Sequence, residues 1–222
     1  QPLAPITNPL EMDETITHVV AKLQASSVYP NLYRRAFGDS IITGEHTLKA
    51  ISQFILTLVS SNSKYDSVMR KQTNFTEQEN NGYLLYKKNC SSCHSEPLFT
   101  NNEFMINGLT VDTTLNDYGR LGVTKNPCDS LKFKVPTLRN IEFSYPYMHD
   151  GRFKRLSEVL KHYTSGVVHS KTLSKELETP IVLSSNEKVD IIAFLLSLTD
   201  KTFLFILVKN RFATQYFCKW LC

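Results

Sequence analysis

The segment Cys90-Ser91-Ser92-Cys93-His94 places two thiols and an imidazole within five residues. Two cysteines one helical turn apart can form thioether bonds with both vinyl groups of one haem, and the imidazole of the next residue can reach the iron. This C-x-x-C-H spacing therefore predicts a covalently attached c-type haem, held by Cys90 and Cys93 and ligated by His94.

Two other chemistries use cysteines at this spacing. A structural zinc ion usually takes four ligands, and the sequence has no second Cys/His pair at zinc-binding spacing. A redox-active C-x-x-C is expected in a strand–helix–strand setting, which the sequence lacks. A zinc or thiol protein is therefore the less favoured alternative to haem.

The far side of such a haem needs its own ligand. Met148, in the stretch YPYMHDGR, offers a thioether, and the other candidates are Tyr163, His149, His162 and His169. The choice matters because a methionine raises the iron's potential, whereas a tyrosinate lowers it. Each of these residues is also common as a packed or surface side chain, so spacing alone leaves the ligand open.

The elements that position the motif are predicted to be helices joined by long loops. Thr76 can cap a helix that runs to Cys90, and residues 186–200 form an amphipathic helix. In a cytochrome c fold these two helices cross beside the haem, and Gly82 permits their close approach. Residues 95–140 have little periodicity, so a haem must supply much of the core. The predicted fold class is mainly α, with a cytochrome c-like domain.

The sequence before this domain is also predicted to be helical. An irregular loop over residues 1–12 precedes helices over 13–24, over 29–38 and from Thr43 onward, and the polar stretch 60–67 is interpreted as a linker.

Composition narrows the function classes. The 222 residues are 41% hydrophobic and 21% charged, which is ordinary for a globular protein. The net charge of +4 comes without a strong basic cluster, so nucleic acid is not an expected partner. No apolar run reaches the ~18 residues of a membrane span. The first residue is Gln, which we interpret as a processed precursor or a fragment.

Several motifs downstream of the cysteines identify a family. The segment FKVPTLRNIEFSYPYMHDGRFKRLSEVLKHY (133–163) resembles the second haem domain of the bacterial dihaem cytochrome c peroxidases. That family includes the dihaem enzymes that mature the tryptophan-derived cofactor of methylamine dehydrogenase. DYGRLGVT (117–124) and the opening QPLAPITNPLEM fit as well.

The resemblance implies a domain organisation. Residues 1–70 would be a remnant of the N-terminal peroxidatic haem domain, with its distal loop and helices. Residues 71–200 would be the C-terminal cytochrome c-like haem domain, and residues 201–222 are a tail that departs from the family. Because the sequence contains a single C-x-x-C-H, the motif of the first haem is expected upstream of Gln1.

The resemblance also implies roles for residues after the cysteines. The family's distal ligand lies fourteen residues after the histidine of the HDG motif, which is His149, so Tyr163 is favoured over Met148. His149 would lie near the haem edge without ligating it. Ser144 and Pro146 occupy positions whose backbone carbonyls hold a calcium ion, a cation that prefers oxygen ligands.

The opening loop carries the implied catalytic residues. Gln1, Pro5 and Glu11 have the spacing of the family residues that line the distal side of the peroxide-binding haem. Glu11 would be the acid–base group that moves a proton between the two oxygens of the peroxide.

The expected function is that of a periplasmic peroxidase. Hydrogen peroxide would be reduced to water by electrons that a small cytochrome c or cupredoxin delivers through the haem on His94. The resemblance further implies two haems, calcium and a homodimer. The alternative from another class is a single-haem c-type electron carrier with no catalytic activity.

Overall fold

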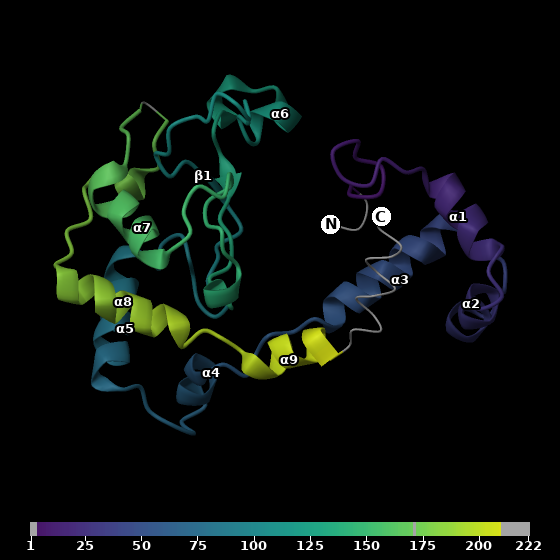
Figure 1. The fold of residues 1–222 in the computed structure, drawn as a ribbon, viewed down its shortest axis with the longest axis horizontal. Helices are drawn as coiled ribbons and strands as arrows, with labels where there is room; N and C mark the ends of the chain where they lie inside the picture. Colours follow the sequence, from purple (N-terminus) through teal and green to yellow (C-terminus); the bar gives the residue numbers. More distant parts are fainter. Residues whose placement is uncertain (1–3, 171, 210–222) are drawn as a thin grey trace. The chain divides into compact units, whose positions relative to one another are not determined.

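The computed structural model describes residues 4–170 and 172–209 (Figure 1). The described residues divide into two compact units, one formed by residues 4–59 with 202–209, and one from Ser60 to Lys201. Helices dominate both units, as predicted. No helix in the described part of the chain is long and apolar enough to cross a membrane.

The first unit is helical. It contains α1 (Ile16–Gln24), α2 (Tyr29–Phe37), α3 (Gly44–Thr57) and most of α9 (Lys201–Lys209). Thr15 and Thr43 cap α1 and α3, because their hydroxyls accept hydrogen bonds from backbone N–H groups of the first turn. The helix α1 contacts both α2 and α3. The hydrophobic core of this unit, among the described residues, is formed by Ile6, Val19, Leu23, Tyr33 and Ile42.

The second unit has longer irregular segments. Its α-helices are α4 (Lys64–Met69), α5 (Glu77–Asn89), α6 (Leu121–Thr124), α7 (Leu156–Lys161) and α8 (Ser185–Leu196). A π-helical turn, η3 (His162–Gly166), continues α7, and three 3-10 turns cover Pro127–Asp129, Ile141–Phe143 and Lys175–Leu177. The strands β1 (Phe104–Met105) and β2 (Phe133–Lys134) pair antiparallel. The loops predicted over residues 95–140 are therefore interrupted only by short elements.

The helices α5 and α8 cross (Figure 1). Gly82 of α5 lies directly against α8. A Cβ atom on Gly82 would lie 1.9 Å from the Asp190 carbonyl oxygen and 2.9 Å from Cβ of Phe194. Both helices begin with a capping box, at Thr76 and at Ser184. This crossing confirms the helix pair that the sequence predicts.

Replacing Gly82 with alanine should destabilise the unit by about 3 kcal/mol, the upper end for an overpacked core. The reason is that the added methyl group would overlap a backbone carbonyl, which can move only with its whole helix. Denaturant unfolding of the haem-loaded chain measures the loss. The matched control is Gly122→Ala in α6, where an added Cβ meets no atom within 4 Å. An equal loss in both variants would contradict this account.

The interpretation of residues 60–67 as a linker is wrong. Ser63 caps α4, and Tyr65 and Asp66 are buried. The Asp66 carboxylate forms an ion pair with Arg139 at 2.8 Å. Burial works against that charge, but hydrogen bonds from Arg139 and Ser63 outweigh it and lower the pKa of Asp66. Ser63 and Asp66 are buried because Asp66 is hydrogen-bonded to Ser63 and to Arg139.

Candidate haem-binding site

A cavity of about 620 Å³ opens inside the unit from Ser60 to Lys201. This volume lies within the range of about 300–1,000 Å³ that is typical of cofactor pockets. Much of its wall is apolar, including Leu138, Ile141, Leu156, Leu160 and Leu195. The cavity brings together these predicted site residues: Cys90, Cys93, His94, Ser144, Pro146, Met148, His149 and Tyr163.

The two cysteines lie where α5 ends. Cys90 is the C-cap of that helix, and the next turn closes when the His94 N–H donates to the Cys90 carbonyl at 2.9 Å. Both thiols are free. Burial raises the pKa of Cys90 to about 12 and also raises the pKa of Cys93. A protonated thiol is a poor nucleophile and a poor metal ligand, so this setting does not favour thiolate chemistry.

The imidazole of His94 is oriented by two backbone carbonyls. Its Nδ1 lies 3.2 Å from the Phe99 oxygen and 3.1 Å from the Pro136 oxygen. When Nδ1 carries the proton and donates it there, Nε2 presents its lone pair as a ligand. Burial lowers the pKa of His94, which favours the neutral form that ligates metals. Two thiols, an oriented imidazole and an apolar wall together fit a c-type haem.

Met148 and Tyr163 both reach the same cavity. Tyr163 lies on the π-helical turn η3, a type of irregularity that is frequent at functional sites. Burial raises the pKa of Tyr163 to about 12. Met148 has a positive φ of 72°, an uncommon conformation for a residue with a side chain. The geometry therefore keeps both residues as candidates for the distal ligand.

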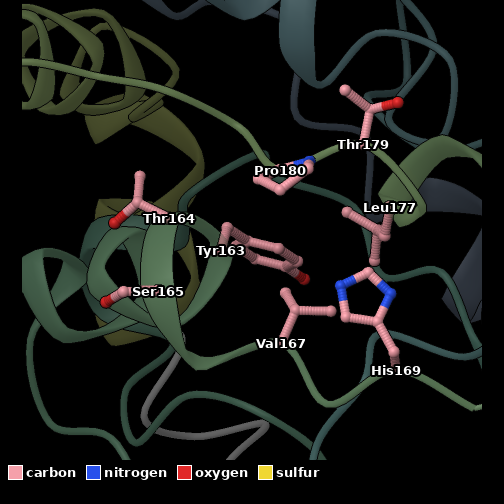
Figure 2. A pocket seen from close by; sticks show the side chains of 8 residues that line it. All are labelled: Tyr163, Thr164, Ser165, Val167, His169, Leu177, Thr179 and Pro180. Carbon is pink, nitrogen blue, oxygen red and sulfur yellow. The ribbon is translucent and has the colours of Figure 1, made fainter.

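The remaining histidines are placed differently. His162 is buried, and its Nε2 lies 2.9 Å from the Asn107 carbonyl oxygen, so that nitrogen is directed at backbone. His169 lines a smaller cavity of about 140 Å³ (Figure 2). His149 stacks on Phe133, with ring centroids 3.8 Å apart. A calcium site at the carbonyls of Ser144 and Pro146 stays a prediction.

The predicted catalytic residues belong to the other unit. Gln1 lies outside the described residues. Glu11 is exposed and accepts a hydrogen bond from Asn8 at 2.9 Å, while the carbonyl of Pro5 accepts one from the Met12 N–H. The acid–base role of Glu11 stays a prediction.

Asn107 is a site residue that sequence reasoning does not find. Its side-chain nitrogen lies 3.6 Å from the Met148 sulfur, and both residues line the cavity. A single asparagine in a segment without periodicity gives no signal of its own, and only its contacts distinguish it.

Known proteins show where the chain belongs. The family model described as "Di-haem cytochrome c peroxidase" matches residues 1–74. Methylamine utilization protein MauG of Methylophilus methylotrophus is 34% identical over 205 residues, which are 89% of this chain and 60% of that protein. Cytochrome c551 peroxidase of Nitrosomonas europaea is 35% identical over 205 residues, which are 90% of this chain and 58% of that protein. The chain belongs to the dihaem cytochrome c peroxidase family.

Solved structures agree with this family. A MauG-like protein associated with microbial copper homeostasis has a TM-score of 0.73 and 29% identity, covering 84% of this chain and 63% of that one. The diheme peroxidase BthA of Burkholderia thailandensis has a TM-score of 0.70 at 18% identity, covering 90% and 63%, and shows the fold alone. The fold is thus cytochrome c-like. The chain spans 55–60% of the length of the first three curated relatives.

Proposed function

We propose that this chain forms the electron-entry haem domain, and part of the peroxide pocket, of a dihaem peroxidase that reduces hydrogen peroxide to water. The observation that carries the proposal is the 620 Å³ cavity. Its wall contains Cys90, Cys93 and His94 together with Tyr163 and Met148. A family of dihaem proteins with members named cytochrome c peroxidase supports the reaction class.

The residues of the cavity would have separate roles in holding the haem. Cys90 and Cys93 bind the haem covalently and His94 ligates its iron, while Tyr163 rather than Met148 is the proposed distal ligand. The bound haem supplies one-electron chemistry. The carbonyl oxygens of Phe99 and Pro136 hold the His94 ring, because they accept the hydrogen bond that its Nδ1–H donates.

The first unit would supply proton transfer. Reduction of one peroxide consumes two electrons and two protons and yields two waters. The Glu11 carboxylate takes the proton from the peroxide oxygen that will stay, and returns a proton to the oxygen that leaves. Gln1 and Pro5 complete this side of the peroxide pocket.

Partners and setting follow from the same proposal. Electrons come from a small cytochrome c or cupredoxin in the periplasm, calcium binds at the carbonyls of Ser144 and Pro146, and the working enzyme is a homodimer. Residues 1–70 correspond to a remnant of the peroxidatic domain and 71–200 to the second haem domain.

A second candidate, a single-haem electron carrier, has one observation in its favour. Every residue proposed to hold the haem lies in the unit from Ser60 to Lys201. A carrier needs no more than that unit, whereas the Gln1, Pro5 and Glu11 spacing has a use only in an enzyme.

Reading the coding sequence 5′ of Gln1, and assaying the protein it encodes, tests the proposal. We expect a second C-x-x-C-H and peroxide-dependent oxidation of a reduced small cytochrome c or cupredoxin. A product with one haem that accepts electrons from the donor, yet leaves peroxide unconsumed, would establish the carrier instead.

A further inference from the structure

The two backbone carbonyls that orient His94 lie on two segments that are joined by threonine hydroxyl groups. The Thr100 hydroxyl donates to the Val135 carbonyl oxygen at 2.6 Å, and the Thr137 hydroxyl donates to the Leu98 carbonyl oxygen at 2.5 Å. We propose that Thr100 and Thr137 are positioning residues that fix the imidazole of His94 and thereby lower the reduction potential of the haem it ligates. This inference rests on the haem-binding function proposed above.

The two hydroxyl bonds are placed reciprocally around the imidazole. Thr100 follows Phe99 and Thr137 follows Pro136, and these are the residues whose carbonyl oxygens lie 3.2 and 3.1 Å from Nδ1 of His94. Each hydroxyl in turn donates to the carbonyl of the residue just before the opposite acceptor. The two oxygens that contact Nδ1 are therefore flanked by one hydroxyl bond on each side.

The direction of each hydroxyl is set by a backbone donor. The Asn102 N–H donates to the Thr100 oxygen at 3.0 Å, and the Arg139 N–H donates to the Thr137 oxygen at 3.1 Å. Threonine side chains form such turns with the backbone two residues further on. Because the hydroxyl oxygen accepts this N–H, its own proton is free to donate to the carbonyl of the other segment. The same arrangement occurs twice, once in each segment.

Other hydrogen bonds between the two segments are longer. The Leu138 N–H donates to the Phe99 oxygen at 3.3 Å, so it shares that acceptor with His94. The Arg139 Nε–H donates to the Pro97 oxygen at 3.0 Å. Both distances exceed those of the hydroxyl bonds, so we expect the threonines to set how close the two acceptor oxygens lie.

A hydrogen bond at Nδ1 changes the ligand strength of the opposite nitrogen. An imidazole whose N–H donates to an acceptor is more basic at Nε2, the nitrogen that ligates the metal. A more basic ligand stabilises oxidised iron more than reduced iron, and hydrogen bonds around the ligands are one way in which a protein sets a haem potential. Carbonyls held close to Nδ1 of His94 therefore keep the potential low, and loosening them raises it.

The two threonines should contribute unequally. Thr100 is partly buried, whereas Thr137 is exposed and lines the 620 Å³ cavity. A hydrogen bond that water can replace has a small net effect when it is lost. The loss of the Thr100 hydroxyl should therefore shift the potential more than the loss of the Thr137 hydroxyl.

Valine substitutions in the full, haem-loaded chain test this inference, because valine keeps the branched shape and lacks the hydroxyl. The reduction potential and the free energy of unfolding are measured for Thr100→Val, for Thr137→Val and for the double variant. Thr100→Ser keeps a hydroxyl and should restore the parent potential. The matched control is Thr199→Val, since Thr199 is a buried threonine of the same unit that donates to the Glu142 carboxylate at 2.7 Å and does not line the cavity.

We expect the double variant to raise the ratio of reduced to oxidised haem at a fixed solution potential by about tenfold, which is about 59 mV for a one-electron couple. Thr100→Val should give the larger single effect. Thr199→Val should lower the free energy of unfolding without moving the potential.

Three results would overturn the inference: an unchanged or lower potential in the double variant, an equal shift in Thr199→Val, or a shift that Thr100→Ser does not reverse. If Thr100→Val does not retain haem, Thr137→Val decides. A haemochrome assay separates this inference from the proposed function. A parent chain without covalent haem overturns that function, whereas haem-bearing variants with the parent potential overturn only the role of the threonines.

Discussion

Replacing both Cys90 and Cys93 with alanine should give a chain that carries no covalent haem and whose unit from Ser60 to Lys201 is unfolded. At about 24 cal/mol per Å³ of void, the 620 Å³ cavity would cost on the order of 15 kcal/mol if it stayed empty. A typical domain has only about 5–15 kcal/mol of stability in total, so collapse or unfolding is the expected response.

The measurement is a pyridine haemochrome assay, followed by circular dichroism, on protein made by a host competent in cytochrome maturation. Cys128→Ala is the control, because Cys128 is a free and exposed cysteine that does not line the cavity. It should retain both haem and fold. A colourless parent chain that is nevertheless cooperatively folded would refute the haem assignment.

Replacing Glu11 with glutamine should slow peroxide turnover by about 10²–10⁴-fold in the enzyme that includes the upstream haem. Glutamine keeps the oxygen that accepts the hydrogen bond from Asn8, so the loop is preserved while the acid–base group is lost. The haem on His94 should still be reduced by the electron donor, which separates proton transfer from electron entry.

Asp13→Asn is the matched control for this experiment. Asp13 is an exposed carboxylate in the same loop with a φ of 45°, which asparagine also tolerates. Its turnover should equal that of the parent enzyme. Equal rates in all three proteins would remove Glu11 from the mechanism.

The helices could be predicted because each leaves a local signal, and the haem attachment is a prediction that rests on a signal of the same local kind. Thr76 has the residue type of a helix cap, and Gly82 permits the close approach of the two helices. The CSSCH spacing is local too, so the proximal side of the site follows from a few consecutive residues.

The distal side could not be predicted from spacing in the same way. Met148 and Tyr163 are fifteen positions apart, and the irregular turn that carries Tyr163 depends on contacts with residues far away in sequence. Asn107 comes to lie beside Met148 in the cavity wall only when the chain folds. The interpretation of residues 60–67 as a linker is wrong for a related reason. Composition shows only that the residues are polar, whereas the burial of Asp66 depends on its ion pair with Arg139, far away in sequence.

The hydrogen bonds at the two ends of the haem unit have a practical consequence. The Asp200 carboxylate accepts hydrogen bonds from the backbone N–H groups of Ser61 and Asn62 at 2.9 and 2.8 Å. The segments at which the chain enters and leaves this unit therefore meet at one carboxylate. A segment whose ends lie together can be lifted out and grafted into another sequence with little disturbance at the junctions. Residues 60–201 should therefore behave as a transferable cassette, and Asp200 is the side chain that any such graft must retain.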